Sequence, residues 1–176
     1  MRTQQHNEPL SYEKVLHMFR ETDKQMKETD KKMKELQHLF TGHWGKLIES
    51  LIEGDLINML AKRGINIRNT YTRATYTYNH QKGEIDIIAA NGNEVVVVEV
   101  KTTLHPKDVE EFIETLTIFK KAFPIYKNET IYGAVAYLKT ESKADLRAER
   151  MGLFVIRATG NSATITNDKK FKPTAF

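Results

Sequence analysis

A run of valines crossed by two opposite charges constrains the fold of this chain more than any other feature. Residues 95–98 are four consecutive valines, and Glu99, Val100 and Lys101 follow them. β-Branched residues favour extended backbone, and a run that is apolar on both faces is typical of a central strand covered on both sides. Because side chains alternate between the two faces of a strand, Glu99 and Lys101 share one face with Val97. The sequence therefore places a carboxylate and an ammonium group side by side within a buried sheet.

A third charge lies on the strand expected just before this run. Asp86 is set among isoleucines in the segment 84–88, and Asn91-Gly92-Asn93 separates that segment from the valines. A short Asn/Gly turn between two apolar strands predicts a β-hairpin. Removing charges from water is costly unless they are paired or bind an ion, so three of them in one hairpin require an explanation.

The length of the hairpin loop decides how Asp86 meets Glu99. If the loop is Asn91-Gly92, Glu84 lies opposite Glu99; if it is Gly92-Asn93, or has four residues, Asp86 lies opposite Glu99. Either register places the three charges on one face, because opposed residues of an antiparallel pair point the same way. A loop with an odd number of residues would separate them unless a bulge intervened.

Two carboxylates at cross-strand distance repel each other, and a hard divalent cation bound between them removes that repulsion. Magnesium is the expected ion. Such an ion lowers the pKa of a bound water and polarises a phosphoryl oxygen, and a neighbouring lysine such as Lys101 can orient the attacking water. The pattern therefore predicts hydrolysis of phosphodiester bonds.

Periodic segments flank the hairpin on both sides. We expect a helix over about 43–62 ended by Gly64, strands near 65–78, a helix from Pro106 to about Ala122, and a strand over 130–138. A short helix capped by Ser142 and strands over 153–157 and 163–166 complete residues 42–167. This order predicts an α/β fold with helices packed on a mixed sheet, followed by a loose tail over 168–176.

The first 41 residues have a different pattern. Apolar or small side chains recur at alternating steps of three and four, and charged residues fill the positions between them, which predicts one helix with a coiled-coil seam ending at Thr41-Gly42. A lone helix with so narrow a stripe is unstable, so the stripe meets a second copy or folds back on the domain. The seam consists of Tyr12, Val15, Phe19, Thr22, Met26, Thr29, Met33, Leu36 and Phe40.

Composition excludes several classes of protein. The chain has no cysteine, which rules out disulfide frameworks, thiol catalysis and cysteine-ligated zinc. No stretch approaches the ~20 apolar residues that cross a bilayer, and residues 1–9 lack the apolar core of a secretion signal, so we expect a cytoplasmic protein without a membrane partner. The net charge of +4 is compatible with a polyanionic ligand. The six histidines show no metal-ligand spacing, and we assign them no role.

These residues resemble the PD-(D/E)XK nuclease superfamily, whose motif is an acidic residue on one strand followed by Glu-x-Lys on the next. Here the motif is Asp86 and then Glu99-Val100-Lys101, although Ile85 stands where the superfamily's name has proline. Similarly spaced archaeal Holliday-junction resolvases add a glutamate from the first helix. Glu49 matches it, since helical geometry places Glu49 at the border of the apolar face and Glu53 further toward solvent.

The segment Trp44-Gly45 with Glu49 four residues on is also similar to uncharacterised prokaryotic proteins that join a coiled-coil helix to this nuclease fold. The resemblance implies a restriction-endonuclease-like fold in which Asp86, Glu99 and the Val100 carbonyl bind Mg²⁺, or Mn²⁺ in its place. It further implies that Lys101 positions the attacking water and that Glu49 contributes to metal or water binding.

We therefore expect a magnesium-dependent endonuclease that cuts DNA and assembles as a homo-oligomer through its N-terminal helix. Two alternatives stay open. One is a non-catalytic nucleic-acid-binding or assembly protein that retains the fold, because a fold alone does not imply an activity. The other is a coiled-coil scaffold with no nucleic-acid role.

Overall fold

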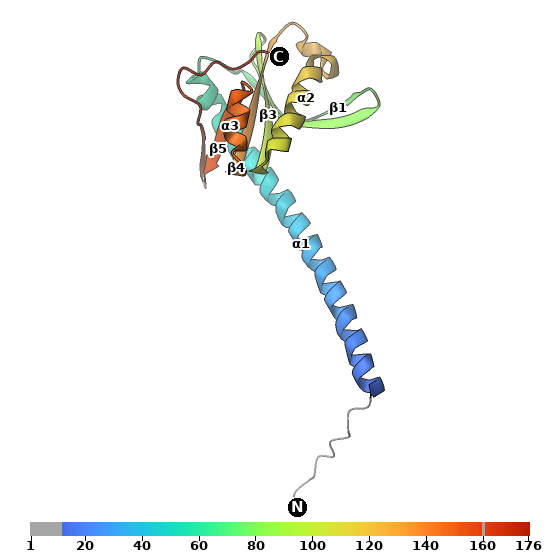
Figure 1. Cartoon of the computed structure of the whole chain (residues 1–176). Helices are drawn as coiled ribbons and strands as arrows, with labels where there is room; N and C mark the ends of the chain where they lie inside the picture. Colours follow the sequence, from blue (N-terminus) through green and yellow to red (C-terminus); the bar gives the residue numbers. More distant parts are fainter. Residues whose placement is uncertain (1–11, 160) are drawn as a thin grey trace, which may run out of the picture. The chain divides into compact units, whose positions relative to one another are not determined.

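The computed structural model describes residues 12–159 and 161–176, with the backbone alone over 37–44. Its contacts divide the chain into two compact units, residues 1–42 and residues 43–176. The sheet and all the predicted site residues belong to the second unit (Figure 1). Within the described residues, no helix combines the length and the apolar character needed to cross a membrane.

Helix α1 spans Tyr12–Ala61 without interruption, so the predicted helix end at Thr41-Gly42 was wrong. A single glycine inside a helix costs only about 1 kcal/mol relative to alanine, which the surrounding good helix formers offset. The helix ends at Ala61, and Gly64 provides the left-handed stop that the sequence predicted. Gly64 has a φ of 85° and its N–H bonds the Ala61 carbonyl, while the Ile65 N–H bonds the Leu60 carbonyl at 3.0 Å. These two bonds form a Schellman cap, and both Leu60 and Ile65 are buried beneath it.

Six strands form one mixed sheet in the order of the sequence, which confirms the predicted α/β class. β2 pairs antiparallel with β1 and β3, β4 pairs parallel with β3 and β5, and β6 closes the sheet antiparallel to β5. The strands are β1 (Asn69–Tyr78), β2 (Gln81–Ala90), β3 (Glu94–Leu104), β4 (Thr130–Thr140), β5 (Phe154–Thr159) and β6 (Ser162–Ile165). The remaining elements are helix α2 (Pro106–Ala122), the 3-10 turn η1 (Pro124–Tyr126) and helix α3 (Ala144–Arg150).

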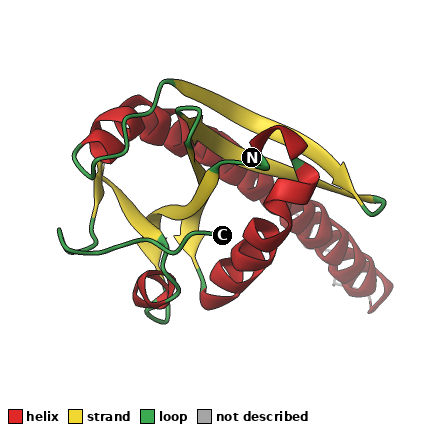
Figure 2. Ribbon diagram, turned by 90° about the horizontal axis from the view of Figure 1, so that it is seen from above, coloured by secondary structure: helices red, strands yellow, loops and turns green. Residues whose placement is uncertain are grey.

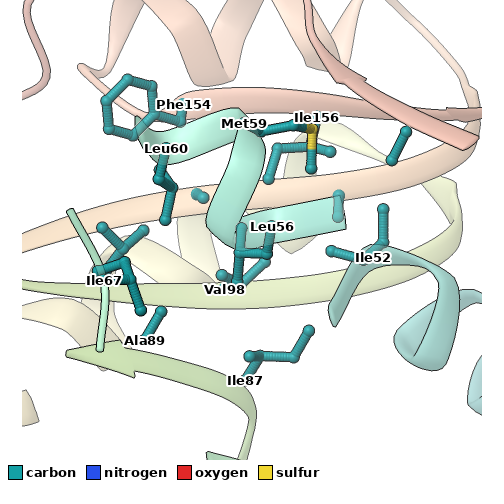
Figure 3. Packing of buried hydrophobic residues seen from close by; sticks show 14 of the residues in the cluster. Ile52, Leu56, Met59, Leu60, Ile67, Ile87, Ala89, Val98, Phe154 and Ile156 are labelled. Atoms are coloured by element: carbon teal, nitrogen blue, oxygen red, sulfur yellow. The ribbon is translucent and has the colours of Figure 1, made fainter. Parts of the chain in front are cut away.

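The alternating valines of β3 divide the core into two layers, as the sequence predicted. Val96 and Val98 pack in the layer under α1, and Figure 3 shows Ile52, Leu56 and Leu60 of that helix against Ile87, Ala89 and Val98 of the sheet. Val95 and Val97 pack in the opposite layer with Phe112 and Leu116 of α2. Helices therefore cover both faces of the strands (Figure 2).

The β2–β3 hairpin adopts the second of the two expected registers. Ala90 lies opposite Val95 and Ile87 opposite Val98, so the loop is Gly92-Asn93. Gly92 takes a φ of 92°, and the Asn91 side chain accepts the backbone N–H groups of Asn93 and Glu94. These turn bonds fix the register and, with it, the position of Asp86 relative to β3.

Two expectations near the C-terminus were wrong. Ser142 does not cap α3; Ser142 and Lys143 both have left-handed backbone, with φ of 51° and 57°, and Lys143 is the N-cap without a side-chain bond. The segment after Asn167 is not loose. Ala175 forms a β-bridge with Tyr132, and the Phe176 N–H bonds the Ile131 carbonyl at 2.9 Å. The segment pairs there because β5 meets β4 only from Ala134 onward, which leaves backbone groups of β4 open.

Candidate active site

The site lies where β2 and β3 separate. Their last paired residues are Ile87 and Val98; beyond them β2 pairs only with β1, and β3 pairs only with β4. Asp86 and Glu99 are the first residues past this point on each strand. The Asp86 carboxylate fills the gap, because its Oδ2 accepts the backbone N–H of Val100 at 2.6 Å. A side chain thus takes the place of the missing backbone partner.

The sheet is also irregular on the other side of Asp86. The β1–β2 pairing places Thr72 opposite Ile87 and Ala74 opposite Ile85, but skips the position between, where Arg73 faces Asp86. Arg73 has a φ of 56°, a left-handed conformation that is uncommon for residues other than glycine. Ile85 and Ile87 are two residues apart yet pack in opposite layers of the core, so β2 rotates at Asp86. The strained backbone of Arg73 and the charged side chains of Arg73 and Asp86 therefore lie at the same position of the β1–β2 pairing.

Glu99 and Lys101 form an ion pair on the α2 side of β3. Lys101 Nζ lies 2.5 Å from Glu99 Oε1, and the Glu99 side chain is only 19% exposed. Burial raises the pKa of Glu99, and the negative charge of Asp86 raises it further, against the opposing effect of Lys101. Burial lowers the pKa of Lys101, but Glu99, with Asp108 and Asp86, outweighs burial and the net pKa is raised. Lys101 therefore carries its proton at neutral pH.

Asp86 is a poorly stabilised carboxylate despite its hydrogen bond. Burial raises its pKa, and this effect exceeds the lowering by the Val100 N–H and by Lys101. A group whose charged form is disfavoured in the folded protein gains from a bound cation. A nearby positive charge would therefore favour the ionised form of Asp86.

Glu49 approaches Asp86 from α1, on the other face of the sheet. Its side chain is 16% exposed, and its pKa is raised first by burial and then by the charge of Asp86. Glu53, the alternative on the same helix, accepts a hydrogen bond from the Thr70 hydroxyl at 3.2 Å instead. Glu49 is therefore electrostatically coupled to Asp86, whereas the carboxylate of Glu53 is bonded to β1.

Arg73 is the charged neighbour that sequence reasoning left out of the site. Its Nε lies 3.5 Å from Glu49 Oε2 and 3.6 Å from Glu84 Oε1, so it joins α1 to β2 beside Asp86. It lowers the pKa of both Glu49 and Asp86. The signal that finds it is the β1–β2 register, which puts Arg73 opposite Asp86.

The charge of Asp86 thus raises the pKa of two glutamates, Glu49 and Glu99, that come from opposite faces of the sheet. Among the residues that the structure describes, no three His, Cys, Asp or Glu side chains gather closely enough to form a metal-binding group. The oxygen donors that follow the last paired residues of β2 and β3 are the carboxylates of Asp86 and Glu99 and the carbonyl of Val100. Mg²⁺ suits such a set, because it retains several waters and needs only one or two protein carboxylates.

The domain is a mixed sheet in which β2 and β3 separate beside Asp86, Glu99 and Lys101. The chain belongs to the DUF4143 family, described as a domain of unknown function, whose family model matches residues 44–143. The matched residues include Glu49, Asp86, Glu99 and Lys101. No curated protein matches the sequence.

Several solved structures are similar in fold at low identity. A protein of unknown function called AF1548 has 17% identity over 58% of this chain and 54% of its own, with a TM-score of 0.43. A repair endonuclease from Pyrococcus abyssi has 17% identity over 60% and 45%, with a TM-score of 0.42. EndoMS in a complex with double-stranded DNA has 14% identity over 62% and 44%, with a TM-score of 0.40. The chain spans about half the length of these structures, and likenesses this weak carry no inference about its chemistry.

Proposed function

We propose that this protein is a divalent-metal-dependent endonuclease that hydrolyses phosphodiester bonds of DNA. One observation carries the proposal: two partly buried carboxylates of raised pKa, Asp86 and Glu99, lie where the sheet opens, with a protonated lysine beside them. Such an arrangement opposes folding stability, and perturbed carboxylates of this kind concentrate at functional sites.

Mg²⁺ or Mn²⁺ would be held by the Asp86 and Glu99 carboxylates and the Val100 carbonyl, with Glu49 contributing to metal or water binding. Oxygen donors of this type match hard divalent cations, and the absence of cysteine excludes soft thiolate ligation. When bound, the ion supplies charge stabilisation at a phosphoryl oxygen and a more acidic water.

The side chains of the site divide the remaining work. Lys101 stays protonated, so it can donate hydrogen bonds to the attacking water or to a phosphate oxygen but cannot accept a proton. Glu49 is the better proton acceptor, because a carboxylate of raised pKa lies nearer the pH at which it must work. At the separation of β2 from β3, Val100 pairs only with β4, and the Asp86 carboxylate takes the place of a β2 backbone partner.

The test is cleavage of labelled linear, branched and single-stranded DNA by the purified full chain with Mg²⁺ or Mn²⁺. Glu99→Ala and Lys101→Ala should each abolish or strongly reduce cleavage. Glu94→Ala is the matched control, since Glu94 lies on the same strand at its paired end, where it bonds Asn91. Equal cutting by wild type, Glu99→Ala and Lys101→Ala would reject the proposal.

A second candidate function is nucleic-acid binding without cleavage. The observation that favours it is that the described carboxylates form no group of three suited to a metal. DNA binding that weakens with salt, together with no cleavage in Mn²⁺, would decide for it.

A further inference from the structure

The N-terminal part of α1 exposes several large apolar side chains along one face. Over residues 12–36, Phe19 is 71% exposed, Met26 61%, Met33 59% and Leu36 66%. Soluble chains seldom leave such a row in water, since contiguous exposed apolar surface marks an interaction site. Each of these residues lies on the seam of alternating three- and four-residue steps.

The hydroxyl groups of the two seam threonines already form hydrogen bonds within the helix. The Thr22 hydroxyl donates to the Met18 carbonyl and the Thr29 hydroxyl to the Gln25 carbonyl, each at 2.8 Å. Because both hydroxyl protons are already used within the helix, an apolar partner can cover these side chains without leaving an unpaired donor. The two threonines are therefore compatible with a dry interface over residues 12–36.

The residues beside the seam indicate what covers it. In heptad terms Phe19, Met26 and Met33 occupy position a, and Asp23 and Asp30 occupy position e. Antiparallel pairing with a second copy sets position e against position e, which brings aspartates together; Lys27, 2.8 Å from Asp23, offsets only part of that repulsion. Parallel pairing sets e against g instead, where the Gln25 amide of one copy can donate to Asp30 of the other.

We propose that residues 12–36 of α1 pair in parallel with the same residues of a second copy of this chain. The occupant is the chain itself, because a parallel pair matches each seam residue with its own kind and relieves the like-charge contacts of the alternative. This inference makes no use of the nuclease proposal, and either can fail while the other holds.

The absence of native cysteine gives a direct test in the full-length protein. Thr29→Cys places a thiol at position d, where parallel pairing brings two equivalent residues within disulfide reach. Lys31→Cys is the matched control on the outer face of the helix. Mild oxidation should convert most of the Thr29→Cys protein, and little of the Lys31→Cys protein, to covalent dimers.

Light scattering after size exclusion completes the test. Wild type should elute as an oligomer, Met26→Glu with Met33→Glu as a monomer, and Lys24→Glu with Lys31→Glu as an oligomer, all with the circular dichroism of a folded domain. A monomeric wild type would overturn the proposal. It is the result expected if the seam packs on the domain of its own chain instead. Equal cross-linking of Thr29→Cys and Lys31→Cys would overturn parallel pairing.

Discussion

Asp86 and Asn167 perform the same structural task in two parts of the sheet, but their energetics differ. Each accepts a strand N–H at 2.6 Å where backbone pairing ends: Asp86 that of Val100, and Asn167 that of Val155. Asn167 is neutral and buried, and its amide also donates to Glu149 and to the Leu153 carbonyl, each at 3.3 Å. Asp86 is ionisable, and burial raises its pKa. The amide meets the structural need alone, so a carboxylate in that role indicates a further function.

Asp86→Asn should produce the largest change, a loss of DNA cleavage without loss of the fold. The amide oxygen can still accept the Val100 N–H, so the fold is retained, while the charge that would hold a cation is lost. We expect DNA cleavage to fall by about 10²–10³-fold, the size seen when a charge-stabilising group is removed from an active site. Cleavage rates normalised to the folded fraction should be unchanged in Asn167→Ala. A lower normalised rate in that variant would contradict the distinction between a functional Asp86 and a structural Asn167.

Asn167→Ala should give the largest loss of stability. It removes the acceptor of the Val155 N–H and two donated bonds from a buried position. Leaving such a donor unpaired lowers the free energy of unfolding by about 1–3 kcal/mol, which urea or thermal unfolding measures. Asn128→Ala, at an exposed position, should be close to neutral, and a similar loss in both variants would refute the structural role of Asn167.

Glu99→Gln should change how stability depends on pH. The pKa of Glu99 is raised from 4.5, so the folded protein holds this proton more tightly than the unfolded chain does. Stability then falls as the pH rises from about 4.5 through the raised pKa, and is lowest once Glu99 is charged. We expect Glu99→Gln to flatten this fall and to raise the melting temperature at neutral pH by a few degrees, whereas Glu94→Gln should not.

A divalent cation should also change the melting temperature. Mg²⁺ or Mn²⁺ at neutral pH should raise the melting temperature of wild type, because a ligand that binds only the folded state stabilises it. The shift should disappear in Asp86→Asn and remain in Glu94→Gln. An equal shift in all three proteins would show that the ion binds elsewhere.

Arg73→Ala should have the smallest effect. Arg73 contacts Glu49 and Glu84 without filling a core position, so the fold should persist. Because Arg73 lowers the pKa of Glu49, its removal should move the acid limb of the cleavage pH profile to higher pH. We expect kcat to fall by about tenfold or less, below the roughly 10²–10⁴-fold effect of removing a general base itself. Arg68→Ala, at an exposed residue just before β1, is the control and should leave the profile in place.

Much of the hairpin and its surroundings could be predicted from the sequence. The valine run, the Asn-Gly turn and the proline-bounded helix α2 each have a strong local cause, so their residues and their core faces follow from short segments. The choice between the two hairpin registers could not be made, since both bury the same valines. The turn bonds of Asn91 decide it, and these depend on three-dimensional geometry.

The errors share a physical origin. A local pattern contains neither long-range contacts nor the sum of many small propensities. These decide that the helix continues through Thr41-Gly42, that the segment after Asn167 is anchored and that the turn at Ser142 is left-handed. Arg73 was missed for the same reason, because only the pairing of β1 with β2 reveals its neighbour Asp86. The rotation of β2 at Asp86 likewise breaks the alternation on which strand reasoning rests.

The outer strands of the sheet have a consequence for the protein at high concentration. β1 and β6 are the two edges, where unpaired backbone groups can recruit strands from other molecules. β1 is kinked by the left-handed Arg73, and β6 has only four residues. Neither edge offers a long flat template, so concentrated samples of the domain should resist fibril growth by strand addition.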